Sequence, residues 1–263
     1  GGKEMEKLGF KSLFPMSEIT VMGLAEVIPS LPNLYMRIRQ TIADIKKQNP
    51  CIIVTIDAPD FSFRILKKIS KSEIPLVHYV APSVWAWKPG RAKKIAQFLN
   101  KLLTLFPFEP PYFEKEGLST VFVGHPVVES KAGMGEGVTF RKRYKIPKSA
   151  KVLSVLPGSR VSEIKRLLPI IMNAINCLDR KNLYINLPTL DNLVVHINDL
   201  LKHWDIPVIV TTTIEEKYAG LAAADVAVAA SGTVSLELAM ARVPNVSIYK
   251  FNPITAFIGR RLV

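Results

Sequence analysis

The stretch "KVLSVLPGSRVSEI", residues 151–164, gives the clearest indication of the fold. An apolar run of strand length ends in a Pro-Gly turn, and a helical pattern starts directly after it. Apolar residues then recur at helical spacing, so they share one face of the helix. They are Ile164, Leu167, Leu168, Ile171, Met172, Ile175 and Leu178. A continuous apolar strand followed by an amphipathic helix indicates an α/β fold with parallel sheets. Pro169 lies inside this helix, where we expect a kink or a break.

The same alternation extends in both directions along the chain. Strands are expected over 51–57, 75–82, 101–108, 119–126, 151–157, 183–188, 206–212, 225–231 and 244–250. The stretch 131–150 is Gly-rich and then basic, has no sustained apolar period, and is predicted to be a linker. The pattern therefore predicts two α/β domains, 1–137 and 138–263. We expect their parallel sheets to be covered on both faces and to face a cleft. Such sheets bind ligands at the carboxyl ends of their strands.

Composition limits the classes of function. The chain has 263 residues and is 48% hydrophobic, which excludes extensive disorder. Its net charge is +13, and residues 1–150 hold 23 Lys and Arg against 13 Asp and Glu, a net of +10. This excess indicates an acidic partner: nucleic acid, anionic lipid or a phosphorylated substrate.

No signal peptide and no apolar run of about 18 residues is present. Cys51 and Cys177 lack metal-ligand spacing and are predicted to be buried, reduced thiols.

The first strand end of interest reads "IDAPDFSF", residues 56–63. Asp57 closes the strand and Asp60 comes just before the next helical pattern. Aspartate is a common helix N-cap, and this interpretation is favoured by the local pattern, although Phe63 replaces the glutamate of a capping box. The other interpretation is a general base at a cleft. "DAPD" is not the Asp-x-Asp of metal-dependent sugar transferases, so no metal is predicted.

The second strand end is "LPGSR", residues 156–160. Gly158 lets the backbone approach a ligand, and Ser159 with the following amides lies at a helix N-terminus, which favours an anion. Arg160 adds a planar guanidinium suited to phosphate oxygens. The alternative is a surface arginine paired with Glu163, which leaves the neighbouring small residues unexplained.

The third strand end is "ASGTVSLELAM", where Ser231, Gly232 and Thr233 separate a strand from a helix. This is a second anion site of the same kind. Glu237 lies one turn into the helix. Its side chain either faces solvent or accepts hydrogen bonds from the two hydroxyls of a ribose. The P-loop and the Gly-x-Gly-x-x-Gly motif are both absent from the sequence. Two anion sites and a nearby carboxylate suggest a nucleoside diphosphate.

Seven stretches together resemble the lipid-A-disaccharide synthase family, which are inverting glycosyltransferases of the two-domain GT-B type. They are "VMGLAEVIPSLP", "TIDAPDF", "YVAPSVWAWKPGR", "FPFE", "VGHPVVE", "LPGSR" and "SGTVSLELA", in family order over nearly the whole chain. "LPGSR" or the last stretch alone is a weak signal, whereas "SVWAW" with "DAPDF" and "LPGSR" is highly specific.

The resemblance implies a reaction. UDP-2,3-diacylglucosamine would donate its sugar to the 6-hydroxyl of 2,3-diacylglucosamine 1-phosphate, giving lipid A disaccharide 1-phosphate and UDP. Asp60 matches the family's catalytic base, which reverses the preference for the N-cap interpretation. Arg160 matches the arginine at the UDP phosphates, and the UDP site would also include Ser159 and the third strand end with Glu237. Helix N-termini and cations stabilise the leaving group in this class, so no cofactor or metal is implied.

The resemblance also assigns a second group of residues. Cleft candidates are Asp57, Ser83, Trp85, Arg91 and His125. Five apolar residues at roughly helical spacing would form an exposed patch for membrane and acyl chains: Val27, Ile28, Leu31, Leu34 and Tyr35. By pattern alone these would be ordinary core residues. Tryptophans beside lysines and arginines in "WAWKPGRAKK" suit an anionic membrane surface. The expected location is the cytoplasmic face of the inner membrane of a Gram-negative cell, and no nucleic-acid motif is present.

The sequence also departs from the family pattern. The family has a strand and a "GExSGD"-type loop ahead of the "GG" that opens this chain, and helices beyond "FIGRRLV". We expect their loss to impair acceptor binding, cleft closure and the homodimer of intact members. Two alternatives stay open: a catalytically impaired UDP- or glycolipid-binding fragment, and another GT-B enzyme such as a UDP-sugar epimerase. The acyl-sized patch and "SVWAW" argue against the epimerase.

Overall fold

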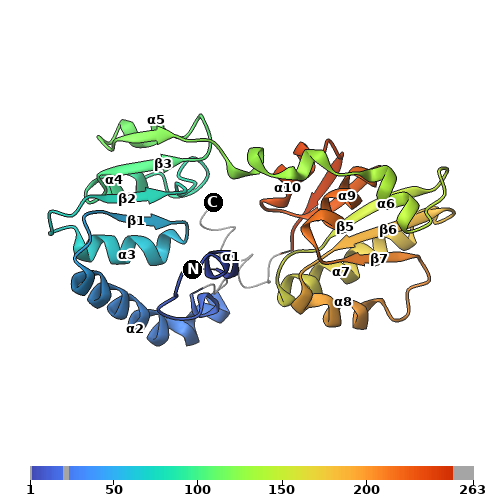
Figure 1. Cartoon of the computed structure of the whole chain (residues 1–263), viewed down its shortest axis with the longest axis horizontal. Coiled ribbons are helices and arrows are strands. Elements are labelled where there is room, and N and C mark those ends of the chain that lie inside the picture. Colours follow the sequence, from blue (N-terminus) through green and yellow to red (C-terminus); the bar gives the residue numbers. More distant parts are fainter. Residues whose placement is uncertain (1, 20–23, 251–263) are drawn as a thin grey trace. The chain divides into compact units, whose positions relative to one another are not determined.

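The computed structural model describes residues 2–19 and 24–250, without the side chains of Lys3, Glu4, Ser17 and 24–30. The described residues form two compact units, 2–125 and 126–250 (Figure 1). All nine predicted strands are confirmed, and every strand pairing among the described residues is parallel.

The first unit contains a four-stranded sheet in the order β1-β2-β3-β4. Its strands are β1 (Ile53–Ile56), β2 (Leu76–Tyr79), β3 (Lys101–Thr104) and β4 (Thr120–Phe122). Its helices are α1 (Lys3–Lys7), η1 (Met16–Glu18), α2 (Leu24–Gln48), α3 (Pro59–Ile69), α4 (Arg91–Ala96) and α5 (Pro111–Glu114). Leu66, Leu76, Leu102 and Phe113 are fully buried in the core between sheet and helices.

The two faces of this first sheet differ. The strands follow chain order, and right-handed crossovers then place α3, α4 and α5 on the same face. His78 and Leu102 point to that face and are 0% exposed. On the opposite face Val54 and Ile56 are 52% and 57% exposed. The prediction that both faces are covered is wrong for the described part of this unit.

The second unit contains a five-stranded sheet in the order β7-β6-β5-β8-β9. Its strands are β5 (Lys151–Leu156), β6 (Leu183–Pro188), β7 (Val208–Thr211), β8 (Val226–Ala230) and β9 (Asn245–Ile248). Its helices are η2 (Pro126–Glu129), η3 (Lys131–Met134), α6 (Gly137–Arg143), α7 (Val161–Asn176), η4 (Asp191–Leu193), α8 (Val194–Leu201), α9 (Ile214–Ala223) and α10 (Val234–Met240). Here α7 and α8 line one core and α9 and α10 another, so both faces are covered as predicted.

The helix α7 differs from the prediction made from its local sequence pattern. It runs from Val161 to Asn176 without interruption through Pro169, so the expected break is absent. Packing of its buried face offsets the loss of one N–H donor. Leu178 lies beyond the helix and is 57% exposed. Cys177 caps the helix end and Cys51 precedes β1. Both are exposed, so the prediction of buried thiols is wrong.

The predicted linker is part of the second unit. Ala132 is fully buried, and α6 packs across α9 with Phe140 in a core cluster. The unit boundary falls at 125/126 rather than at 137/138. A Cβ added at Gly135 would lie 2.0 Å from the Tyr218 carbonyl oxygen. Gly135 therefore lets two backbones come into contact, whereas in the sequence such a glycine indicates a flexible segment.

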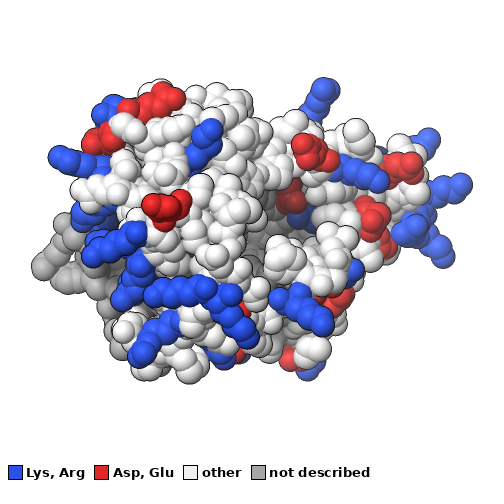
Figure 2. Space-filling model, turned by 60° about the vertical axis from the view of Figure 1, so that its left-hand side comes forward, with Lys and Arg blue, Asp and Glu red and all other residues white. Residues whose placement is uncertain are grey.

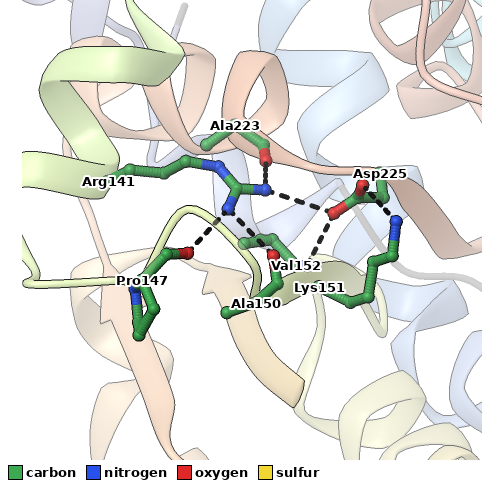
Figure 3. A network of polar contacts seen from close by, with 7 residues as sticks. All are labelled: Arg141, Pro147, Ala150, Lys151, Val152, Ala223 and Asp225. Atoms are coloured by element: carbon green, nitrogen blue, oxygen red, sulfur yellow. Dashed lines mark hydrogen bonds and ion pairs between the residues drawn. The ribbon is translucent and has the colours of Figure 1, made fainter. Parts of the chain in front are cut away.

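A network around Arg141 anchors the basic end of this segment (Figure 3). Its guanidinium donates to the carbonyls of Ala150 at 3.0 Å and Ala223 at 2.9 Å and to the Asp225 carboxylate at 3.2 Å. The Val152 amide donates to Asp225 at 2.8 Å. Burial acts to raise the pKa of Asp225, but the Val152 amide, Lys151 and Arg141 hold it below its ordinary value. One arginine thus joins α6 to the starts of β5 and β8.

We expect Gly135→Ala to lower the free energy of unfolding by about 1–3 kcal/mol, because the new methyl group would collide with the backbone of α9. Urea unfolding followed by circular dichroism measures this loss. Gly90→Ala is the matched control, since an added Cβ there meets no heavy atom within 4 Å. Equal stability of the two variants would contradict the close packing of the backbone at Gly135 on α9.

Candidate functional site

The carboxyl edge of the first sheet has unusual backbone conformations. Asp57 and Ala58, after β1, have φ of 53° and 44°, and Val80, after β2, has φ of 78°. The Asp57 amide donates to the Tyr79 carbonyl at 2.9 Å, so these two strand ends are adjacent. Left-handed φ in residues other than glycine costs about 1–3 kcal/mol each and clusters at functional sites. The edge therefore stands out before any side chain is considered.

Asp60 lies at this edge, in the first turn of α3. The N-cap of α3 is Ala58, so the N-cap interpretation of Asp60 is wrong. Arg91, the first residue of α4, donates from Nη2 to Oδ1 of Asp60 at 2.5 Å. The Asp60 side chain is 85% exposed, whereas that of Arg91 is 25% exposed and lies over the Phe63 ring. The structure thus brings together two predicted residues and leaves the carboxylate open to a ligand.

A buried histidine that the sequence analysis missed lies beside this pair. His78, in β2, is 0% exposed, and its Nδ1 lies 2.7 Å from the Thr55 hydroxyl. Its ring centroid is 4.5 Å from that of Phe63, the residue under Arg91. Burial lowers the pKa of His78 to about 4. The only sequence signal was one polar residue inside the apolar run "PLVHYV".

This burial predicts a pH dependence of stability. The unfolded chain protonates His78 below its ordinary pKa of 6.5, whereas the folded chain does so only near 4. Its contribution is complete above pH 6.5 and declines as the pH falls to 4, a loss of about 3 kcal/mol. Urea unfolding at pH 7 and pH 5, followed by tryptophan fluorescence, measures the slope. We expect His78→Gln to flatten it. An unchanged slope in that variant would assign the pH dependence to other groups.

Three other predicted residues lie at neighbouring strand ends of this unit. The Ser83 carbonyl accepts the Ala86 and Trp87 amides in a turn. Trp85 is 48% exposed and contacts Phe108, while His125 contacts Phe106. The edge therefore changes from charged groups at β1 to aromatic groups toward β4.

In the second unit, "LPGSR" and "ASGT" follow β5 and β8, which are neighbouring strands with Leu156 paired to Ala229. The two predicted anion sites therefore lie side by side, as the nucleoside diphosphate interpretation requires. The Ser231 amide donates to the Ile248 carbonyl at 2.9 Å, and Ser231, Gly232 and Thr233 are exposed. Exposed backbone between two parallel strand ends is suited to contact with a ligand.

Arg160 is the N-cap residue of α7. Its side chain pairs with that of Glu163, Nη1 to Oε1, at 3.0 Å. The other oxygen of Glu163 accepts the Ser159 amide at 2.9 Å. Gly158 has φ of 118°, and a Cβ there would lie 2.4 Å from Glu163 Oε2. The predicted alternative of an Arg160–Glu163 pair is thus observed, and it accounts for Gly158. Arg160 keeps 42% of its side chain exposed, which leaves its guanidinium available to a phosphate.

Glu237 is not solvent-facing, because its side chain is only 17% exposed. Lys217 donates to its Oε2 at 2.5 Å and the Tyr218 hydroxyl to its Oε1 at 3.4 Å. Burial raises the pKa of Tyr218. Both partners come from α9 and were missed, because "EEKYAG" resembles an ordinary solvated helix. They orient the Glu237 carboxylate one turn into α10.

The predicted apolar patch is only partly described. Leu31 and Tyr35 on α2 are 42% and 55% exposed, as predicted. Leu34 packs against the core, so its assignment to the patch is wrong. The side chains of Val27 and Ile28 lie outside the described residues. Figure 2 shows Lys and Arg side chains gathered in the lower left of the face drawn, with fewer acidic ones.

Within residues 2–19 and 24–250, no helix combines the length and apolarity needed to cross a bilayer. The same residues contain no group of three or more His, Cys, Asp or Glu placed to hold a metal ion.

Comparison with known proteins gives a consistent result. The family model described as "Lipid-A-disaccharide synthetase" matches residues 1–263. The lipid-A-disaccharide synthase of Rhodospirillum centenum is 46% identical over 267 residues, and that of Paramagnetospirillum magneticum is 47% identical. Each alignment covers 100% of this chain and 67% or 68% of the relative. The chain thus spans about two thirds of the length of these relatives.

Solved structures support the fold class. The S. aureus MnaA–UDP co-structure has a TM-score of 0.61 at 12% identity, covering 97% of this chain and 70% of that one. The UDP-GlcNAc 2-epimerase of Methanocaldococcus jannaschii with UDP-GlcNAc and UDP has a TM-score of 0.56 at 15% identity, with 92% and 70% covered. At such identity only the fold is shared, which confirms the two-domain GT-B prediction. Because the family model matches residues 1–263 and these relatives are more than 40% identical, the chain belongs to the lipid-A-disaccharide synthase family of glycosyltransferases.

Proposed function

We propose that this chain transfers the sugar of UDP-2,3-diacylglucosamine to the 6-hydroxyl of 2,3-diacylglucosamine 1-phosphate. The observation that supports it is the exposed Asp60 carboxylate paired with Arg91 at a strained strand end, inside a family-matching motif. As the acceptor oxygen bonds to C1 of the donor, Asp60 takes its proton. The bond from C1 to the UDP oxygen breaks with inversion, and UDP leaves with the electron pair.

In this proposal the second unit binds UDP. The N-terminus of α7, a helix of 16 residues, favours the diphosphate, and Arg160 adds its guanidinium. The Glu237 carboxylate, oriented by Lys217, would accept hydrogen bonds from the ribose hydroxyls. Since these groups supply the positive charge that the leaving diphosphate needs, we propose that no metal or cofactor takes part.

We further propose that the protein works at the cytoplasmic face of a Gram-negative inner membrane, as a peripheral protein. Leu31 and Tyr35 expose apolar surface on α2, and the net charge of +13 would attract anionic lipid.

A UDP- or glycolipid-binding protein without transfer activity is the second candidate, since every proposed UDP contact lies in the second unit and none of them requires Asp60. An assay of the 263-residue chain with both diacylglucosamine substrates, beside UDP binding by calorimetry, separates the two. Disaccharide formation supports the transferase. UDP binding without product supports the second candidate.

A further inference from the structure

A row of aromatic rings follows β2, β3 and β4 at the carboxyl edge of the first sheet. The centroids of Trp85 and Phe108 lie 5.5 Å apart in an edge-to-face contact. Phe108 stacks on Phe106 at 5.5 Å, and Phe106 contacts His125 at the same distance. We call Trp85, Phe106, Phe108 and His125 the aromatic row. Its members come from three different strand ends, so the fold assembles it.

The aromatic row is both exposed and rigidly held. Trp85 and Phe108 are each 48% exposed, so about half of each ring remains available for burial. Glu109 is only 3% exposed, and its Oε2 accepts the amides of Leu105 at 3.1 Å and Phe106 at 2.9 Å. A buried carboxylate thus fixes the turn that presents the two phenylalanines. Apolar surface held in place before binding avoids much of the entropic cost of ordering it.

The position of the aromatic row relates it to the proposed chemistry. Asp60 and Arg91 follow β1 and β2, and the row continues along the same edge to β4. Neighbouring strands are about 4.8 Å apart, so the edge spans about 14 Å from β1 to β4. A ligand along it would meet an ion pair at one end and aromatic rings toward the other. That sequence of surfaces matches an amphipathic molecule.

Positive charge beside the aromatic row further restricts the class of ligand that it would bind. Lys88 lies three residues after Trp85, with its ammonium over the Trp87 ring, and Arg91 begins α4 at the same edge. Resting on the proposed function, we propose that the aromatic row binds an acyl chain of the acceptor, 2,3-diacylglucosamine 1-phosphate. The apolar chain covers Trp85 and Phe108, while the basic residues favour the phosphate group.

Fluorescence quenching tests this contact directly. Trp87→Phe with Trp204→Phe leaves Trp85 as the single tryptophan of the chain, which has three. The probe is 2,3-diacylglucosamine 1-phosphate with bromine atoms on its acyl chains, and glucosamine 1-phosphate is the acyl-free control. We expect the brominated lipid to quench Trp85 at least twofold and the control to leave it unchanged. Absence of quenching at saturating lipid would overturn the proposal.

A variant gives an independent measure. We expect Phe108→Ala to weaken binding of the diacylated acceptor about fivefold to tenfold and to leave glucosamine 1-phosphate binding unchanged. Tyr112→Ala is the matched control, since Tyr112 is an exposed aromatic on α5 outside the row. Equal losses in both variants, or an equal loss for both ligands, would overturn the acyl-chain assignment.

The two experiments distinguish failure of the proposed acyl site from failure of the proposed transferase activity. Disaccharide formation without quenching of Trp85 would refute the acyl site and leave the transferase standing. Quenching in a protein that forms no disaccharide would support the acyl site and refute the transferase.

Discussion

Replacing Asp60 with alanine is expected to lower kcat for disaccharide formation by about 10²- to 10⁴-fold, the usual contribution of a general base. The acceptor hydroxyl has a pKa far above neutrality, so its attack on C1 needs a group that takes the proton. Asp60 offers a carboxylate that is 85% exposed and oriented by Arg91. UDP affinity should not change, because every proposed UDP contact is made by the second unit.

Two further variants sharpen this test. Asp60→Asn keeps the size of the side chain and removes its basicity, so it should lose as much activity as Asp60→Ala. Glu73→Ala removes an exposed carboxylate ahead of β2, at the other end of the strand, and should keep full activity. Undiminished turnover in Asp60→Asn would exclude Asp60 as the base.

Replacing Arg160 with alanine is expected to raise the Kd for UDP by about 10- to 100-fold, the cost of one or two charge-assisted hydrogen bonds to phosphate. In the structure Arg160 pairs with Glu163 through Nη1 and keeps 42% of its side chain exposed. Its other nitrogens are therefore available to diphosphate oxygens. Calorimetry with UDP measures the change.

The control for Arg160 lies on the same helix. Lys165→Ala removes an exposed cation of α7 and should leave the Kd for UDP within about twofold, because Lys165 lies past the first turn of the helix, where the effect of the N-terminus on a bound anion has fallen off. Arg160→Lys should recover only part of the affinity, since an ammonium lacks the planar fork of the guanidinium. Unchanged affinity in Arg160→Ala would contradict the phosphate contact.

Much of the candidate site could be predicted from sequence. Asp60, Arg160 and the turn at Ser231 each follow an apolar strand, and parallel strands bring such positions to one edge of a sheet. Lys217 and Tyr218 could not be found this way, because they reach Glu237 from a helix distant in sequence. His78 was missed for a related reason, since its surroundings are built by Thr55 and Phe63.

The α/β class, the nine predicted strands and the strand ends that hold the charged groups follow from the amino-acid sequence, because apolar periodicity and turn residues act locally. Three features emerge only in the folded chain: the packing of 131–150 on α9, the exposure of one face of the first sheet among the described residues, and the exposure of both cysteines. Folding also brings four aromatic residues into one row. Close backbone approach, burial and side-chain contact depend on residues far apart in the chain, and a local pattern does not contain them.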